Sequence, residues 1–163
     1  MTDESIQSVL RGLVPSDIPR FVPSPQGGIG RVCSCYDGDT VTLLCLLGGE
    51  PARIALRILG VDAPERRGRG EVETRAASDV RQVVEALVLD KVLHVHVVGV
   101  DKYGRMLGDL RLGDGEFLSE YLLRLGIVRA YDGACRRPFS IEELKVISAA
   151  AQSALKSNGG DPS

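Results

Sequence analysis

The sequence has few aromatic residues and no large excess of either charge. Phe, Trp and Tyr together make up 4% of the 163 residues, and tryptophan is absent. This scarcity argues against an extended base-stacking surface. There are 20 lysines and arginines and 22 aspartates and glutamates, so the formal net charge is -2. Such a balance provides no global positive field, and a polyanionic substrate must therefore meet a local basic patch.

The chain also lacks a long apolar segment near its start and a CxxC pair. Its first residues, MTDESIQSVLRGLV, include two early acids and no uninterrupted apolar core, and they predict neither a signal peptide nor a membrane span. Without a CxxC pair, a common zinc motif is excluded. We interpret the four cysteines as buried free thiols, with a disulfide as the alternative: Cys33, Cys35, Cys45 and Cys135. Free thiols favour the cytoplasm, whereas a removed signal peptide would mean a secreted protein.

Length and composition predict one globular domain with a distinct segment at each end. A chain of 163 residues with 44% hydrophobic content is long enough to bury a core. Residues 1–28 are rich in proline and glycine, so we expect an extension that has a short amphipathic turn or two over 4–13 and lies as a strap against the domain surface. The domain is predicted to span residues 29–157, and residues 158–163 to form a flexible tail.

Hydrophobic periodicity predicts an α+β fold that is mainly β. Ile54, Leu56 and Ile58 alternate with polar or small residues, which is typical of a half-buried strand. Gly48-Gly49 predicts a tight hairpin turn. The predicted strands cover residues 31–36, 40–47, 53–59, 91–98, 105–112 and 127–131. Helices are predicted over 71–89, over 117–125 and from 141 onward.

Two of these helices have a distinct local signature. An apolar stripe at helical spacing predicts the buried face of the first: Val72, Ala76, Val80, Val83, Val84 and Leu87. Ser140 and Glu143 form a capping-box pattern at the start of the last. Its inward residues are predicted to be Ile141, Leu144, Ile147 and Ala151.

The segment Tyr36-Asp37-Gly38-Asp39-Thr40-Val41 is the first candidate site. Asp-Gly is typical of a turn, in which the glycine accepts a positive φ and the aspartates bond their own backbone. The turn leads into the predicted strand 40–47, so two carboxylates are held at the mouth of a strand. A hard dication prefers oxygen ligands held in this way. Such turns are also common on solvated surfaces, and the motif alone leaves both interpretations open.

Further charged residues follow the third predicted strand. Arg57 lies on the face opposite the core, from which its guanidinium could reach Asp39. Pro64 ends the strand and leaves Asp62 and Glu65 on a loop. The basic run 66–70 is either a solvated surface or a mobile lip that attracts polyanions. His94 and His96 share a strand face and are interpreted as exposed or helix-contacting imidazoles rather than metal ligands.

Three of these motifs together resemble the staphylococcal nuclease (thermonuclease) family. They are Asp37 to Val41, Leu56 to Glu65, and the turn Asp101-Lys102-Tyr103-Gly104-Arg105, in the family's order and approximate spacing. The resemblance extends from about residue 30 to 155. It implies an OB-fold, a five-stranded Greek-key barrel with three flanking helices. It also implies a calcium-dependent nuclease that acts on DNA and RNA and leaves 3'-phosphate products.

The resemblance also implies which residues would bind the metal. Asp39 and Asp62 would bind Ca²⁺ directly, the position of Ala63 would contribute its backbone carbonyl, and Thr40 would bind through a water. The staphylococcal enzyme has threonine at the position of Ala63, but a carbonyl ligand does not depend on the side chain.

The same resemblance assigns the catalytic residues. Glu65 would orient the attacking water or accept its proton, while Arg57 and Arg105 would bind the phosphate from opposite sides. A guanidinium hardly deprotonates, so we expect Arg105 to stabilise charge on the leaving oxygen rather than donate a proton.

Substrate contacts are implied at three positions. Lys102 and Tyr103 match residues that contact a neighbouring phosphate, and Tyr131 matches one of two tyrosines near the base. Gly133 falls near the place of the second, which predicts weaker base stacking. The implied partners are single-stranded or locally melted DNA and RNA, the expected state is a monomer, and no membrane association is expected. The alternative is a catalytically inactive OB-fold module that binds nucleic acid or a protein partner.

Overall fold

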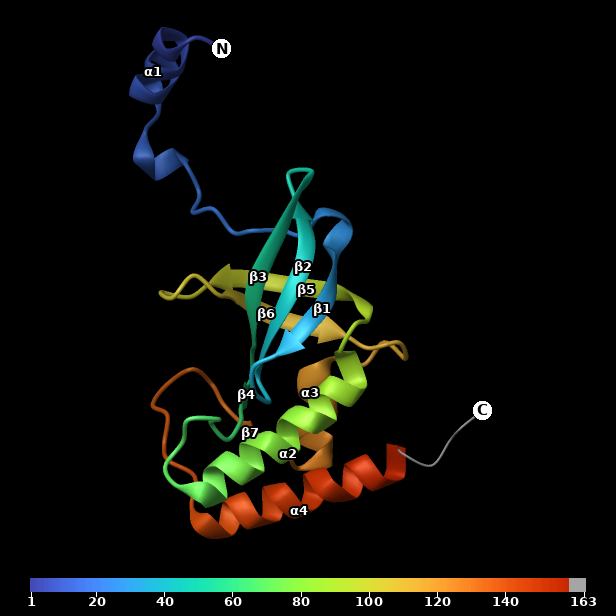
Figure 1. Cartoon of the computed structure of the whole chain (residues 1–163). Coiled ribbons are helices and arrows are strands. Elements are labelled where there is room, and N and C mark those ends of the chain that lie inside the picture. The colour runs from blue at the N-terminus through green and yellow to red at the C-terminus, as the bar shows by residue number, and fades with distance from the viewer. Residues whose placement is uncertain (159–163) are drawn as a thin grey trace.

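Five strands close into a barrel in the order β1-β2-β3-β6-β5 (Figure 1). The computed structural model describes residues 1–158. All neighbouring strands are antiparallel except β3 and β6, which pair in parallel. The barrel confirms the predicted OB-fold architecture. The strand bounds are β1 Ile29–Cys35, β2 Thr40–Leu47, β3 Glu50–Ile58, β5 Val92–Val100 and β6 Met106–Arg111.

The hairpin between β2 and β3 sets the register that builds the site. Gly48 and Gly49 form a two-residue loop with φ of 59° and 90°, which the turn of a tight hairpin requires. The pairing then runs without a shift and places Thr40 opposite Arg57. Along β3, Leu56 and Ile58 are fully buried, as the alternation predicted.

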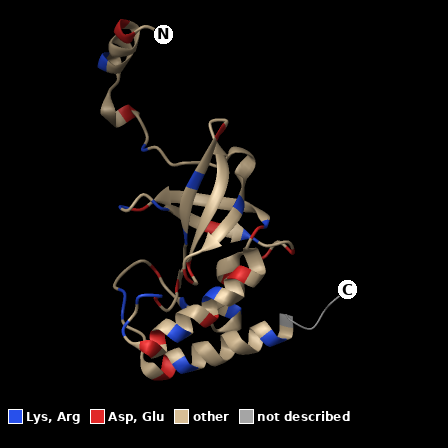
Figure 2. Ribbon diagram, viewed as in Figure 1, with Lys and Arg blue, Asp and Glu red and all other residues tan. Residues whose placement is uncertain are grey.

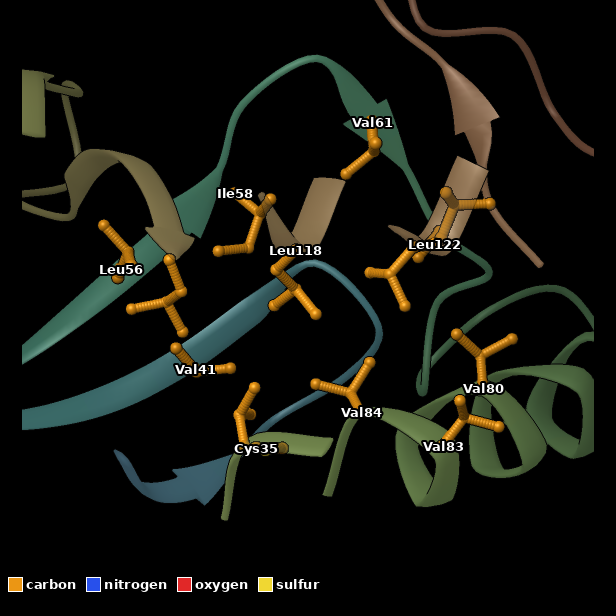
Figure 3. Close-up of a cluster of buried hydrophobic side chains, with 14 of the residues drawn as sticks. Cys35, Val41, Leu56, Ile58, Val61, Val80, Val83, Val84, Leu118 and Leu122 are labelled. Atoms are coloured by element: carbon orange, nitrogen blue, oxygen red, sulfur yellow. The ribbon is translucent and has the colours of Figure 1, made fainter. Parts of the chain in front are cut away.

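Helices cover one end of the barrel. In Figure 1, α2 (Glu71–Val88) and α4 (Ile141–Asn158) lie side by side below the strands, with α3 (Leu118–Leu125) near them. Figure 3 shows the buried side chains of β2, β3, α2 and α3 pointing toward one another. The capping box at the start of α4 is confirmed by hydrogen bonds from Ser140 N to Glu143 Oε2 and from Glu143 N to Ser140 Oγ.

Two residues of the predicted helical core are exposed instead. Val72 is 39% exposed and Ile141 is 55% exposed. Both lie in the first turn of their helix. The remaining predicted residues of the α4 core, Leu144, Ile147 and Ala151, are buried.

A second, two-stranded sheet joins segments far apart in the sequence. β4 (Val61–Asp62) pairs with β7 (Arg129–Ala130), and Asp62 lies opposite Arg129. This pairing brings the loop between β4 and α2 next to the loop between β7 and α4, as Figure 1 shows. The candidate site lies where these loops meet the turn between β1 and β2.

The chain ends differ from the expectation. Helix α1 (Asp3–Gly12) contains no buried residue and stands apart from the barrel in Figure 1, so the predicted strap is wrong for this part of the extension. It also adds a helix to the three that were expected. The last part of the extension does lie against the domain, because Pro25 is buried and the 3-10 turn Gln26–Gly28 contacts β2 and β5. Helix α4 runs to Asn158, the first residue of the predicted tail, and the rest of that tail, 159–163, lies outside the described residues. Within residues 1–158, no helix has the length and apolar character needed to cross a membrane.

The cysteines are free, as predicted, but they differ in burial. Cys35 and Cys45 are buried and Cys33 is half-buried. Cys135 is exposed on the loop before α4, so its predicted burial is wrong. Burial raises the pKa of the Cys35 thiol to about 12.

Candidate functional site

The turn between β1 and β2 holds the first two acids close to the helical layer. Tyr36 N donates a hydrogen bond to Thr40 O at 2.9 Å, and Asp39 N donates to Asp37 Oδ1 at 3.3 Å. Gly38 is not among the residues with positive φ, so the predicted reason for this glycine is wrong. A Cβ at this position would lie 2.5 Å from a methyl of Val80 in α2. Gly38 is therefore required for close packing of the turn on α2.

Asp39 is buried and paired with an arginine. It is 4% exposed, and its Oδ2 lies 3.2 Å from Nη2 of Arg57. The same oxygen accepts a hydrogen bond from the backbone N of Ala63 at 3.2 Å, and Oδ1 accepts one from the Thr40 hydroxyl at 2.9 Å. The predicted reach of Arg57 to Asp39 is confirmed, and it follows from the β2–β3 register.

Asp62 is fully buried, so the prediction that it is displayed on a loop is wrong. It belongs to β4, where its strand partner Arg129 donates a hydrogen bond from Nη2 to Oδ2 at 2.7 Å. The Arg129 guanidinium also lies 3.9 Å from the ring centroid of Phe139. Glu65, three residues further along, is exposed on the loop as predicted, with 48% of its side chain accessible.

Arg136 joins the acids of the β4–α2 loop. Its Nη2 lies 2.6 Å from Asp62 Oδ1 and donates a hydrogen bond to Ala63 O at 3.1 Å, while Nη1 pairs with Glu65 Oε1. The contact with Asp62 Oδ1 lacks hydrogen-bond geometry, which leaves that buried oxygen without a hydrogen bond. Burial opposes the charge on Arg136, but the contacts with Asp62 and the charges of Glu65 and Asp39 outweigh it and raise the pKa.

A hollow of about 390 Å³ lies over these groups. Five predicted site residues line it: Asp39, Thr40, Arg57, Glu65 and Arg105. Arg105 pairs with Asp101 through Nε and Oδ2 at 2.7 Å, so its guanidinium is engaged within its own turn. Arginines from both loops complete the lining, namely Arg66, Arg67 and Arg136. Figure 2 shows the blue segments of these two loops gathered beside the helices.

The three predicted substrate-binding residues do not all lie in one place. Lys102 and Tyr103 lie on the turn before Arg105, and the Tyr103 side chain is 72% exposed with the Lys102 amine 5.1 Å from its ring centroid. Tyr131 lines a different hollow, of about 490 Å³, and donates a hydrogen bond to Ala134 O at 3.1 Å. The structure therefore places Tyr103 next to Arg105, whose guanidinium lies 5.7 Å from the ring centroid, and places Tyr131 in a separate hollow.

Asp37 also lines the hollow, and the pKa of its carboxyl group is raised. Burial, followed by the negative charge of Asp39, raises the pKa of Asp37 to about 7. A cation placed in the hollow would favour the charged form of both carboxyl groups.

The donor set around Asp62 suits a hard dication if backbone and water ligands are included. Its oxygens come from the Asp39 and Asp62 carboxylates and the Ala63 carbonyl, with the Glu65 carboxylate next to them, and such oxygens are what Ca²⁺ prefers. The guanidinium of Arg136 already marks a position where a cation touches three of these residues. No group of three or more His, Cys, Asp or Glu side chains in residues 1–158 is arranged to hold a metal, and this includes the exposed His94 and His96.

Sequence reasoning missed Arg129 and Arg136. Their contacts with Asp62 and Glu65 span 67 and 71 residues, so no local pattern reveals them. The only signal is the basic pair Arg136-Arg137, which does not indicate a partner.

The sequence is similar to a nuclease family and to proteins named as endonucleases. The profile of the family described as staphylococcal nuclease homologue matches residues 55–158. An uncharacterized endonuclease of Escherichia coli O157:H7 is 29% identical over 103 residues, which cover 63% of this chain and 61% of the relative. A probable endonuclease, LCL3, of Komagataella phaffii is 26% identical over 76% of this chain and 64% of its own length. A probable staphylococcal-like nuclease, CAN1, of Oryza sativa subsp. japonica is 32% identical over 51% of this chain and 23% of its own length. The chain thus spans less than two thirds of these relatives.

Proposed function

The chain belongs to the family of staphylococcal nuclease homologues, and we propose that it is a calcium-dependent nuclease that hydrolyses phosphodiester bonds of DNA and RNA. One observation carries the proposal: two acids and two arginines of the resemblance, Asp39, Glu65, Arg57 and Arg105, line a single hollow. Carboxylates and guanidinium groups in one open hollow are the combination that hydrolysis of a phosphodiester needs. The endonuclease names of the relatives support the same reaction class.

Asp39, Asp62 and the carbonyl of Ala63 are the residues that would hold Ca²⁺, with Thr40 acting through a water. When bound, the cation supplies positive charge to the phosphoryl oxygens that become more negative during attack. The protein's own contribution is to fix the carboxylates. Asp39 is held by Thr40 and by the backbone N of Ala63, so its oxygens do not have to be reorganised for each turnover.

Arg57 and Arg105 would bind the phosphate. Arg57 is held by Asp39 and by the backbone carbonyls of Ile58 and Val61, which orient its guanidinium at the edge of the hollow. Arg105 is anchored to Asp101 through Nε, so its two terminal nitrogens can make a bidentate contact with the phosphate. Because a guanidinium keeps its proton, both arginines act by charge.

Glu65 is the proposed base. It is the exposed acid at the rim of the hollow, where it can reach a water that attacks the phosphorus. Attack opposite the 5'-oxygen would leave a 3'-phosphate on one product, which is the outcome that the family resemblance implies. The exposed Tyr103 and Lys102 would contact the strand next to the cleaved bond, which favours single-stranded or locally melted substrates.

The test is cleavage of a labelled single-stranded DNA and RNA with Ca²⁺ and with excess chelator. Wild type is compared with Glu65→Gln and with Glu50→Gln, a matched control at the exposed hairpin far from the hollow. We expect calcium-dependent cleavage that falls at least about 10²-fold in Glu65→Gln and is unchanged in the control. Product ends that lose phosphate to a 3'-phosphatase would verify the cleaved bond.

Two results would contradict the proposal. Cleavage that persists in Glu65→Gln would mean that the hollow is not the active site. DNA binding without cleavage, unaffected by chelator, would instead identify an OB-fold binding module.

A further inference from the structure

One guanidinium contacts three of the groups assigned to the metal and its attacking water. Arg136, from the loop between β7 and α4, contacts the Asp62 carboxylate at 2.6 Å, the Ala63 carbonyl at 3.1 Å and the Glu65 carboxylate. These three groups lie within the four-residue segment 62–65, which comprises the end of β4 and the start of the loop to α2. The guanidinium of Arg136 and a Ca²⁺ ion cannot both contact these oxygens at the same time, because the two positive charges would repel each other at close range.

The charges around this position are already balanced. Asp62 has a fully buried side chain and that of Asp39 is 6% exposed, so each carboxylate needs an opposite charge nearby. Four carboxylates face four guanidinium groups: Asp39, Asp62, Glu65 and Glu143 with Arg57, Arg129, Arg136 and Arg137. A dication added to this set would create an excess of positive charge, so its binding favours the departure of one guanidinium.

Arg136 is the arginine best placed to leave. Its side chain is 40% exposed, against 13% for Arg57 and 18% for Arg129. Arg57 is a barrel residue and Arg129 lies in β7, whereas Arg136 belongs to a loop without regular structure. An adjoining hollow of about 320 Å³, which Arg136 also lines together with Glu73, offers space for its side chain.

We propose that Arg136 is an internal counter-ion that occupies the cation position in the metal-free protein and competes with Ca²⁺ for it. The inference rests on the proposed metal site. Glu65 would then be released from its ion pair only when Arg136 is displaced. Metal binding and the availability of the proposed base are therefore linked through one side chain.

The experiment is calorimetric titration of the metal-free full chain with Ca²⁺. Wild type is compared with Arg136→Ala and Arg136→Lys, and with Arg137→Ala as the matched control. Arg137 is the next residue, its side chain is 61% exposed, and it pairs with Glu143 on α4 without a contact to any of the proposed metal ligands. We expect about tenfold tighter Ca²⁺ binding in Arg136→Ala, an intermediate effect in Arg136→Lys, and wild-type affinity in the control.

Thermal unfolding supplies a second readout that does not depend on activity. In chelator, Arg136→Ala should melt below wild type because the buried Asp62 loses a counter-charge. Added Ca²⁺ should raise its melting temperature more than that of wild type, since tighter binding stabilises the folded state more.

The outcomes separate this inference from the proposed function. Equal Ca²⁺ affinity in wild type and both Arg136 variants would overturn the counter-ion and leave the metal site in place. Weaker binding in Arg136→Ala would also overturn it, because Arg136 would then support the metal. Absence of Ca²⁺ binding in every variant would overturn the proposed metal site and, with it, the inference.

Discussion

Removal of the Arg57 guanidinium tests how the buried acid of the barrel is held. In Arg57→Ala, the Asp39 carboxylate keeps its hydrogen bonds with Thr40 and Ala63 but loses the charge at 3.2 Å. Breaking a buried ion pair by deleting one partner costs about 3–5 kcal/mol. Because Asp39 retains two hydrogen bonds, we expect the lower end, about 3 kcal/mol of unfolding free energy.

The assay is urea unfolding of the metal-free protein in chelator, which isolates the pair from any cation. A matched control is Arg53→Ala, an exposed arginine on the same strand without an ion pair among residues 1–158. The control should change the unfolding free energy by less than about 0.5 kcal/mol. In thermal unfolding, the Arg57 variant should melt about 6–12 °C below wild type.

A double variant measures the energetic coupling between Arg57 and Asp39. Asp39→Asn removes the charge that Arg57 balances, so adding Arg57→Ala to it should cost clearly less than Arg57→Ala alone. If Arg57→Ala is no more destabilising than Arg53→Ala, or if the two changes are additive, Arg57 does not stabilise Asp39 in the folded protein.

Three further outcomes are expected. Gly38→Ala should destabilise the fold by about 1–3 kcal/mol in urea unfolding, because the added methyl overlaps a valine of α2; unchanged stability would contradict this packing. Iodoacetamide at mildly alkaline pH should modify the exposed Cys135 first in peptide mapping, while Cys35, with its pKa raised to about 12, stays unmodified until unfolding. Equal rates would contradict the difference in burial. The hydrogen bond from Arg137 and the helix-start amide lower the pKa of Glu143 to about 2, below its unfolded value. The stability lost in Glu143→Gln should therefore be largest above about pH 5 and should vanish as the pH falls toward 2. A pH-independent difference would argue against this ion pair.

Features with a local cause could be predicted from the sequence. The Gly48-Gly49 turn, the β3 alternation and the Ser140–Glu143 capping box each depend on residues a few positions apart, and all three are confirmed. The pairing of Arg57 with Asp39 could also be predicted, because the hairpin turn determines which residues face each other on β2 and β3.

What the sequence did not reveal depends on contacts made only in the folded chain. Asp62 is buried because β4 pairs with β7, a sheet of two residues per strand that no periodicity can indicate. The same pairing supplies Arg129 and brings the Arg136 loop to the site. For Gly38 we predicted a positive φ, but the glycine is required by the close approach of α2. The sequence alone cannot distinguish these two reasons for a glycine.

The arginines of the site explain how a chain with a net charge of -2 can present a surface for polyanions. Arg66 and Arg67 are exposed, line the hollow and have no ion pair among residues 1–158, and Figure 2 shows blue segments on the loop between β4 and α2 that carries them. Each buried acid beside the hollow is balanced by an arginine, so the acids do not cancel the attraction of the exposed basic groups. A nucleic acid would therefore meet a positive rim around a neutral interior, and the interior would gain charge only when a dication replaces a guanidinium. In this arrangement a local basic patch, rather than the overall charge, determines where a phosphodiester can bind.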